Sequence, residues 1–398
     1  MSRKIILVIG IFTILSLAGY GIAYAGAEEL PTWEEVFNPG SDFNYENRVY
    51  ALEEFNNEMF AAVGVSGGGG GQLFRSVDGN NWTTATGRGF DLGVSNGWCG
   101  PDNYYDTMWD MIVFRSQLYI LPSDNCAERP GQILRSPDGV TWEAVTADAF
   151  GLPAYFGYVP QFAKLAAFNG ELYVSLYYFG ETFDIITEVW HSATGDPGTW
   201  AKVMQFPGWW MNGDFHVFKG ALYISSDFRF EVGTWAQLPE QVWRTFDGVN
   251  WEVVVSDGFG NSGSDALGGF ADYKGYLYIG AGWTGTGGQI WRSESGDPGT
   301  WTPVELTGFG DTDNIRIESL VVYQGEIFAS TENWVDGCNI YRSKDGIHWT
   351  AVNEPGWGNL VNVSTTKSAD QLIFKDDLYI GMIVSDGVGI WKLVHPDN

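Results

Sequence analysis

Short runs of alternating apolar and polar residues recur along this chain, separated by turns rich in Gly, Asp and Asn. The most regular unit is an aromatic residue, a short polar turn and then an aliphatic–aromatic pair, a pattern that predicts a β-hairpin. No long helical periodicity accompanies it, so the sequence predicts an all-β protein. The unit occurs seven times, at Phe55–Phe60, Phe114–Tyr119, Phe168–Tyr173, Phe218–Tyr223, Tyr273–Tyr278, Tyr323–Phe328 and Phe374–Tyr379.

Two further apolar runs complete most of these units. A strand follows each hairpin, at Leu73–Ser76, Ile133–Ser136, Val189–Ser192, Val242–Thr245, Ile290–Ser293, Ile340–Ser343 and Ile390–Leu393. A strand built around Trp follows the first six, at Trp82, Trp142, Trp200, Trp251, Trp301 and Trp349. The seventh unit has no such strand, but the segment around Trp33 near the N-terminus reads like the segment around Trp142. A four-stranded repeat of roughly 40–60 residues is typical of a β-propeller. We therefore predict one seven-bladed β-propeller domain of antiparallel four-stranded blades over residues 26–398, closed by an N-terminal strand that completes the last blade.

The first 25 residues differ from the repeats. Arg3 and Lys4 precede the apolar run Ile5–Leu17 and then Ala23-Tyr24-Ala25, which is the order of a secretory signal peptide. The alternative is an uncleaved anchor helix, but the run is short for a membrane span of about 20 residues. We therefore predict a signal peptide over residues 1–25 and a protein that is secreted, periplasmic or at the cell surface, without membrane contact after cleavage.

Acidic residues dominate the charge of the chain. The sequence carries 49 Asp and Glu against 21 Lys and Arg, a formal net charge of −28. Such a surface repels nucleic acid and anionic lipid, so neither is expected as a partner. It suits cationic partners or Ca²⁺, although solubility alone would also account for it. We expect a monomer with no cofactor other than possible Ca²⁺, whose weak oxygen-donor candidates are the loops 311–314 and 262–265.

The cysteines give one further expectation. Of Cys99, Cys126 and Cys338, the first two fall in loops that emerge on the same face of a propeller. An exported protein favours oxidised pairs, so a Cys99–Cys126 disulfide is predicted and Cys338 is expected to be unpaired.

A second motif lies between the last two strands of the repeat. It reads Ser76-Val77-Asp78-Gly79-Asn80-Asn81-Trp82 in the first copy, and similar turns surround Asp138, Asp247 and Asp345. Longer variants end in Asp-Pro-Gly-Thr-Trp at Trp200 and Trp301. An Asp-Gly turn joins two strands because Asp caps backbone amides and Gly accepts a positive φ. We interpret these acids as structural, since one active site needs one asymmetric constellation rather than a ring of copies.

These turns resemble the Asp-box, or BNR repeat, of sialidases and other secreted propellers, whose pattern is Ser-x-Asp-x-Gly-x-Thr-Trp. The resemblance runs through the repeats of the whole mature chain and implies architecture and secretion rather than chemistry. Four copies are one residue shorter than the pattern. Sialidases are six-bladed and bind the substrate carboxylate with an arginine triad, one member of which comes from an Arg-Ile-Pro motif. This chain has no Arg-Ile-Pro motif. The resemblance therefore does not carry the sialidase reaction across.

Three basic residues occupy equivalent places in the repeats. In each repeat we take the residue seven positions before the aromatic that ends the first strand. These residues are Arg48, Thr107, Gln161, Met211, Ala266, Arg316 and Lys367. The basic residues among them fall on repeats that become neighbours when the ring closes, at the mouth of the central channel. They would converge there on an anion or a sugar acid, or else neutralise channel acids. Neighbouring candidates are Trp109, Asp110 and Glu318.

Aromatic residues gather in the loops expected on that same face. They are Trp98, Trp209, Trp210, Trp235, Trp283, Trp334 and Trp357. Exposed rings beside acids and amides are typical of sugar-stacking or protein-binding surfaces, although propellers also use such rings to fill gaps between blades. The first functional hypothesis is a non-catalytic recognition scaffold that binds a glycan or an exported protein, with Trp209, Trp235 and Trp334 in the site. The alternatives are a glycan-active hydrolase or lyase at the channel mouth, and an extracytoplasmic assembly factor or surface-layer component.

Overall fold

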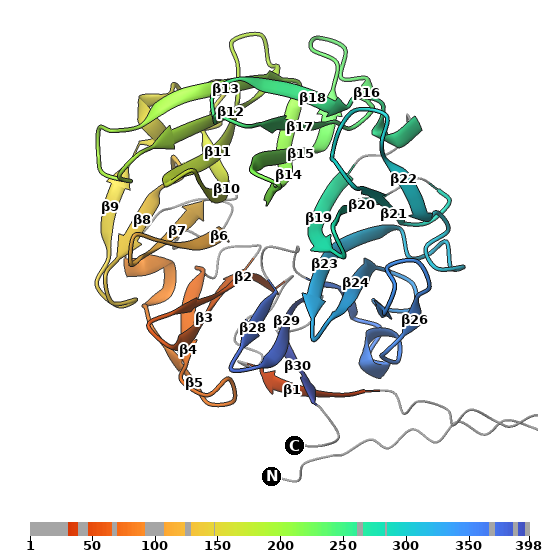
Figure 1. Ribbon diagram of the computed structural model, residues 1–398. Helices are drawn as coiled ribbons and strands as arrows, with labels where there is room; N and C mark the ends of the chain where they lie inside the picture. The colour runs from red at the N-terminus through yellow and green to blue at the C-terminus, as the bar shows by residue number, and fades with distance from the viewer. Residues whose placement is uncertain are drawn as a thin grey trace, which may run out of the picture. The chain divides into compact units, whose positions relative to one another are not determined.

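The computed structural model describes residues 31–38, 47–65, 70–91, 107–123, 129–146, 148–260, 266–282, 285–365, 371–384 and 389–394. The description concerns the unit Pro31–Asn398. The predicted signal peptide, Lys367, Cys99, Cys126 and the 262–265 loop lie outside the described residues. β-Strands and short 3-10 turns make up the regular structure of the described parts, which confirms the all-β prediction (Figure 1).

Most strands pair antiparallel with the next strand along the chain, in meanders of four that form the blades. Two short additional strands pair beside them, β16 (Gln237–Leu238) with β15 and β27 (Asn362–Thr365) with β29. The first three meanders are β2–β5 (Asn47–Phe55, Glu58–Val65, Gln72–Ser76, Trp82–Thr84), β6–β9 (Thr107–Phe114, Gln117–Ser123, Ile133–Ser136, Glu143–Thr146) and β10–β13 (Gln161–Phe168, Glu171–Phe179, Ile185–Ser192, Ala201–Pro207). The next three are β14, β15, β17 and β18 (Trp209–Phe218, Ala221–Phe230, Val242–Thr245, Trp251–Val255), β19–β22 (Ala266–Tyr273, Tyr276–Gly282, Gln289–Ser293, Thr302–Glu305) and β23–β26 (Arg316–Tyr323, Glu326–Glu332, Ile340–Ser343, Thr350–Ala351).

The two ends of the described chain share one sheet. Strand β1 (Thr32–Phe37) pairs antiparallel with β30 (Ile390–Val394), with Trp33 opposite Leu393. Strand β30 pairs with β29 (Asp377–Val384), and β29 pairs with β28 (Leu372–Phe374). Strand β29 also pairs with β2 where Arg48 lies opposite Ile383. The sheet that holds the last strands of the chain is thus joined both to β1 and to the β2–β5 blade.

The first strands of the blades contact one another in succession around a central axis (Figure 1). Apolar clusters fill the boundaries between neighbouring blades. One cluster joins Phe60 of β3 to Met111 of β6, and another joins Phe114 of β6 to Phe162 of β10. Each blade therefore buries its apolar faces against its two neighbours, so that the core is divided among the boundaries rather than gathered in one place.

An aromatic residue in the turn after the outermost strand connects each of several blades to the next. Phe309 has a left-handed backbone with φ 62° and stacks on Tyr341 of the following blade, with ring centroids 3.8 Å apart. Its ring also meets Trp349 of that blade at 5.7 Å. We call such a residue a staple. The other staples are Phe90, Phe150, Phe259 and Trp357, all with positive φ. Phe90 contacts Trp142, and Phe150 contacts Trp190 and Trp200. Phe259 contacts Trp291 and Trp301, and Trp357 contacts Trp391 and Trp33.

These contacts revise the expectations for the Trp residues. Trp82 and Trp251 begin strands β5 and β18, whereas Trp142, Trp200, Trp301 and Trp349 directly precede their strands. The rings of all six meet an aromatic residue from the neighbouring blade. Trp357 was expected among the loop aromatics, but it stacks on Trp391 at 4.9 Å and packs at a blade boundary.

The Asp-Gly turns are capped as their sequence predicts. In the first, Asp78 Oδ1 accepts hydrogen bonds from the backbone N–H groups of Asn80 and Asn81 at 2.9 and 2.7 Å. Ser76 Oγ accepts one from Gly79 N–H at 2.8 Å. Gly79 has φ +74°, and a Cβ there would collide with Tyr379 Oη of β29. The glycine is required both by the turn and by this close approach.

Candidate functional site

The described residues predicted for the channel mouth stand at the start of their strands. Arg48 is the second residue of β2, in the part that pairs with β29, and Arg316 is the first residue of β23. Asp110 lies in β6, Glu318 in β23 and Trp109 beside Asp110. Because Lys367 lies outside the described residues, the structure does not address the predicted convergence of the three cations.

Arg316 is already surrounded by carboxylates. Its Nη1 lies 3.2 Å from Glu318 Oε1, its Nε 3.6 Å from Glu332 Oε2 and its Nη2 4.0 Å from Asp227 Oδ1. All three acids are buried. An arginine held by buried carboxylates compensates their charge. The geometry therefore favours the second interpretation of this cation, neutralisation of channel acids, over an anion-binding role.

Glycines explain how Arg316 reaches Asp227. Arg316 belongs to the β23–β26 blade and Asp227 to β15, so the whole β19–β22 blade lies between them in sequence. Gly282 of β20 pairs with Arg316, and a Cβ on Gly282 would collide with the arginine side chain. The ring of Phe228, next to Asp227, lies 5.8 Å from the guanidinium carbon. The small residues of the intervening blade thus leave room for a contact that spans it.

A buried glutamate lies next to this group. Glu240 accepts hydrogen bonds from Ser226 Oγ and from the Arg229 backbone N–H, the latter at 3.0 Å. Burial raises the pKa of Glu240 to about 8, and the Asp227 carboxylate adds to the rise. Glu240 therefore keeps its proton at neutral pH. Because Asp227 and Glu240 are 2% and 0% exposed, both are closed to a substrate.

A second cluster of charged side chains lies on the inner strands and contains Lys164 and Asp110. Lys164 was not identified from the sequence. Lys164 of β10 is 5% exposed and its Nζ lies 4.0 Å from Asp110 Oδ1. Asp110 also accepts hydrogen bonds from the backbone N–H groups of Leu165 and Met111 at 2.7 and 3.0 Å. Burial raises the pKa of Asp110, whereas Lys164 lowers it. Asp110 is thus an internal ion-pair partner rather than an exposed ligand contact.

The predicted aromatic site residues fall in different environments. Trp109 packs edge-on against Tyr50 at 5.5 Å and borders two apolar clusters. Trp209 is the first residue of β14, where its backbone pairs with Arg229. Trp334 is 50% exposed and donates its indole N–H to Glu332. Trp235 lies in the loop between β15 and β17, a different blade from Trp334. Trp235 and Trp334 therefore belong to separate parts of the surface.

Trp235 belongs to a group of aromatic residues from three loops, which we call the aromatic loop patch. Its members are Phe156, Tyr158, Phe179, Phe183, Phe230 and Trp235. Phe183 stacks on Phe179 at 5.0 Å, meets Phe156 edge-on at 4.9 Å and lies 5.5 Å from Trp235. Tyr158 packs on Phe179 at 4.9 Å, and Phe230 on Trp235 at 5.7 Å. The loops before β10, between β11 and β12, and after β15 thus share one aromatic surface.

This patch is exposed and is held by unusual backbone conformations. Phe156 is 58% exposed and Trp235 is 36% exposed. Phe156, Phe183 and Trp235 all have positive φ, at 55°, 62° and 59°. Such a conformation is costly for a bulky residue. The staples at the blade boundaries share this backbone conformation, so what distinguishes the patch is the exposure of its clustered rings, which is typical of a binding surface.

Polar contacts fix the loops to one another. Tyr155 Oη donates to Glu181 Oε1 at 3.0 Å, which joins the loop before β10 to the loop after β11. Thr182 Oγ1 donates to Asp184 Oδ1, and Thr234 Oγ1 donates to Glu231 Oε2. The sequence pointed to Trp235 but not to Phe156 or Tyr158. Their signal was the aromatic-rich Tyr155–Tyr158 segment, which was not assigned to a site.

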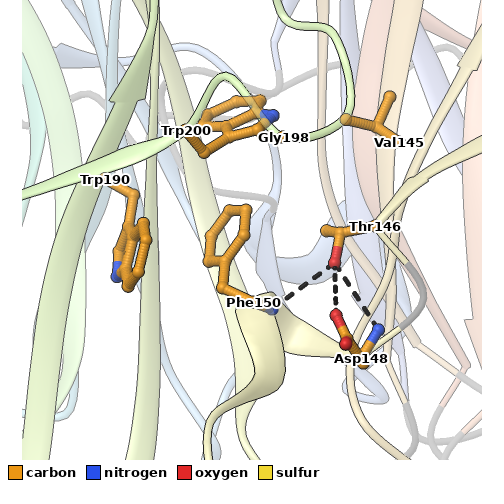
Figure 2. Close-up of a pocket in the computed structure, with 7 residues that line it drawn as sticks. All are labelled: Val145, Thr146, Asp148, Phe150, Trp190, Gly198 and Trp200. Carbon is orange, nitrogen blue, oxygen red and sulfur yellow. Dashed lines mark hydrogen bonds between the residues drawn. The ribbon is translucent and has the colours of Figure 1, made fainter.

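A surface pocket of about 500 Å³ lies between the β6–β9 and β10–β13 blades. Figure 2 shows Phe150 between Trp190 on one side and Thr146 and Asp148 on the other. Phe150 stacks on Trp190 at 4.4 Å, and its backbone N–H donates to Thr146 Oγ1 at 3.4 Å. Phe259 makes the same kind of stack with Trp291 at another blade boundary. We therefore interpret this pocket as part of the repeated boundary packing.

The described residues contain no group of three or more His, Cys, Asp or Glu side chains placed to hold a metal ion. In the 311–314 loop, oxygens accept hydrogen bonds from the protein. Asp311 Oδ1 accepts from Asp313 N–H at 3.0 Å, and Asn314 Oδ1 accepts from Thr331 Oγ1 at 2.9 Å.

Cys338 is a buried free thiol. Within the described ranges, no helix is long and apolar enough to span a membrane.

Comparison with known proteins supports the fold. The family model described as the DUF6242 beta propeller domain matches residues 247–393, which run from the Asp247 turn into β30. No curated protein matches the chain. Because the family match covers less than half of the chain, it supports a propeller without assigning the whole chain to that family.

Solved structures of several enzymes are similar to this chain. One, from a study of two prolyl endopeptidases, is 12% identical with a TM-score of 0.54, covering 91% of this chain and 53% of that one. A puromycin hydrolase is 11% identical with a TM-score of 0.51, covering 89% of this chain and 53% of its own. A sialidase from Trypanosoma rangeli is 13% identical with a TM-score of 0.42, covering 88% and 55%.

The chain spans about half the length of these three proteins. At such low identity a likeness concerns the fold alone, and the sialidase score is too low to carry an argument about activity. The strand arrangement, the family match and the two higher-scoring structures together identify the fold of this chain as a β-propeller.

Proposed function

We propose that this chain is a secreted recognition module, a seven-bladed propeller whose aromatic loop patch binds a glycan or an exported protein. The blade count is supported by the four-stranded meanders together with the sheet of β28, β29, β30 and β1. Closure by β1 is supported by its pairing with β30 and by the contact of Trp33 with Trp357 at 5.7 Å.

The observation that carries the proposal is the exposed aromatic surface shared by three loops. Rings of this kind supply large contact areas with little loss of side-chain freedom on binding. Phe183 contacts both Phe156 and Trp235, so the rings support one another before any ligand arrives. Preorganisation lowers the cost of binding, so a surface of this type suits recognition.

The channel mouth supports the alternative, a glycan-active enzyme, less well. Its best candidate cation, Arg316, is held by Glu318, Glu332 and Asp227. The neighbouring acids are buried, so they are poorly placed to meet a glycosidic bond. A non-catalytic assembly factor would use the same loop patch as the recognition module, and the two differ only in the partner.

The test compares binding by matched variants of residues 26–398. The wild-type protein, Trp235→Ala and Phe183→Ala would be applied to a broad glycan array and used to capture proteins from the exported fraction of the source cells. Phe246→Ala is the control, since Phe246 is 56% exposed in a turn between β17 and β18, outside the patch. A ligand of the patch is expected to be lost with Trp235→Ala and Phe183→Ala and retained by Phe246→Ala.

A second comparison separates the patch from the channel mouth. Arg48→Ala changes a residue at the mouth and is expected to leave binding at the patch unchanged. Loss of binding or appearance of a reaction product that depends on Arg48, without dependence on Trp235, would contradict the proposal and favour the enzyme. Purified protein with and without Ca²⁺ would be compared in the same assay to test the metal expectation.

A further inference from the structure

We infer that the aromatic loop patch takes a basic, Lys- or Arg-rich segment of a polypeptide. This inference rests on the proposed function and names the partner class for the same site. The patch combines three features on one surface: exposed ring faces, exposed carboxylates and an exposed aliphatic side chain. Each feature matches a part of a basic amphipathic peptide.

The charges around the patch are mostly negative. The loops that form it carry the exposed Glu181 and Glu231, the half-buried Asp184 and the buried Glu240, and they contain no Lys or Arg. The nearest basic residue in the sequence is Arg229, near the end of β15. Arg229 is half-buried, and its guanidinium donates to the backbone oxygen of Pro239. Glu181 and Glu231 are exposed, and they lie two and four residues before Phe183 and Trp235 in the same loops. A cationic ligand would gain from these carboxylates, whereas an acidic glycan would be repelled.

The rings themselves favour a cation. The face of an aromatic ring attracts Lys and Arg, and the attraction is strongest where the ring is partly desolvated by its neighbours. Phe156, Tyr158, Phe183 and Trp235 are exposed, yet each packs against another ring. This arrangement leaves ring faces available in a setting that already excludes part of the water.

An apolar component favours a polypeptide over a sugar. Val232, in the same loop as Trp235, is 47% exposed. It lies three residues before Trp235 in the sequence, so this loop offers an exposed aliphatic side chain as well as a ring to a Leu- or Val-bearing peptide. Sugar hydroxyls would find acceptors at the carboxylates, but they would gain nothing from the exposed valine. The combination therefore points to alternating basic and apolar side chains in the partner.

The formal charge of −28 makes a general attraction to basic peptides the main competing explanation. The experiment must therefore separate a local site from the overall field. A synthetic peptide of alternating Lys and Leu residues is the probe, and a Glu–Leu peptide of equal length is its counterpart. Binding to residues 26–398 would be followed by fluorescence anisotropy at low salt and at about 0.15 M salt, where charges are screened beyond about 8 Å.

Five variants give the local comparison. Trp235→Ala is expected to weaken Lys–Leu binding at least tenfold, and Phe246→Ala to leave it unchanged. Glu181→Gln and Glu231→Gln are expected to weaken it several-fold each. Glu294→Gln removes one charge from an exposed turn between β21 and β22 and is expected to have no effect. Circular dichroism of each variant would establish that it is folded.

The outcomes distinguish the inference from the proposed function. Equal weakening by Glu294→Gln and Glu181→Gln, with no effect of Trp235→Ala, means attraction by the overall charge and overturns the inference. Equal or tighter binding of the Glu–Leu peptide, lost in Trp235→Ala, overturns the inference but retains the patch as a recognition site. A neutral glycan that binds in a Trp235-dependent way, without any Lys–Leu binding, does the same. If no ligand of any class depends on Trp235 or Phe183, both proposals fail.

Discussion

The staple Phe309 allows a quantitative test of how blades are held together. Phe309 is half-buried, stacks on Tyr341 and meets Trp349 edge-on. An aromatic side chain buries about 150–250 Å² when fully enclosed, so roughly 100 Å² is lost here in Phe309→Ala. At about 25 cal/mol/Å² this area contributes about 2.5 kcal/mol. The two ring contacts add about 0.5–1.5 kcal/mol between them, so we expect Phe309→Ala to cost about 3–4 kcal/mol of unfolding free energy.

The backbone of Phe309 adds a sharper comparison. At φ 62° a Cβ is unfavourable, so Phe309→Gly loses the same ring but relieves about 1 kcal/mol of backbone strain. Phe309→Gly is therefore expected to be more stable than Phe309→Ala. Leu306, three residues earlier and outside the left-handed residues, provides the control: Leu306→Gly is expected to be less stable than Leu306→Ala by about 0.5–1 kcal/mol.

Urea unfolding, followed by tryptophan fluorescence, would measure all four variants at one pH. The reasoning about the staple is refuted if Phe309→Ala unfolds at the wild-type urea concentration. The reasoning about the backbone is refuted if the glycine and alanine variants have the same order of stability at position 306 as at position 309. A change of slope instead of midpoint would indicate that the blades no longer unfold together.

Three other predictions concern glycine and pH. Gly248→Ala places a Cβ against Tyr173 Oη at φ +80° and should cost at least about 2 kcal/mol, whereas Gly220→Ala, at φ +77° with open space, should cost about 1 kcal/mol; thermal unfolding would show whether the two differ. The turn hydrogen bonds lower the pKa of Asp138 to about 2, so the unfolded chain binds more protons than the folded chain, and the free energy of unfolding should fall as pH drops from about 4 to 2. Asp138→Asn should make this loss smaller. If the variant loses stability with pH as the wild-type protein does, the capping role is contradicted. Burial raises the pKa of Glu240 to about 8, so the folded state keeps a proton that the unfolded state releases, and the free energy of unfolding falls as pH rises from about 4.5 through 8. Glu240→Gln should have the same unfolding free energy as the wild-type protein near pH 4 and exceed it by on the order of 3 kcal/mol at pH 7. An equal difference at both pH values would contradict the burial argument.

The repeat pattern predicted much of the fold because local signals determine it. The hairpin Phe114–Tyr119 corresponds to the end of β6 and the start of β7, and the Asp-Gly turns join the strands where their sequence placed them. Alternation and turn chemistry act over a few residues, so they can be read directly. The likeness between the Trp33 and Trp142 segments likewise anticipated the pairing of β1 with β30.

The candidate site was less predictable because it depends on contacts between distant loops. Trp235 was singled out by residue type alone, whereas Phe156 joins it only because loops from neighbouring blades meet. For Arg316 the sequence left open a ligand contact or the neutralisation of channel acids, and the room left by Gly282 lets it reach Asp227. Lys164 carried no pattern that marked it as the partner of Asp110. Such contacts arise from the assembled ring and have no local sequence signal.

The pairing of β1 with β30 has a consequence for biosynthesis. Strand β1 is made before the other described strands and its partner β30 after them, so β1 has no partner while the strands between them are made. An unpaired strand is an aggregation hazard during that interval. Glu34 and Glu35 lie in β1 at exposed positions, and charged residues of this kind discourage pairing with a wrong strand. The two glutamates of β1 would therefore disfavour a wrong pairing of this strand until β30 is made.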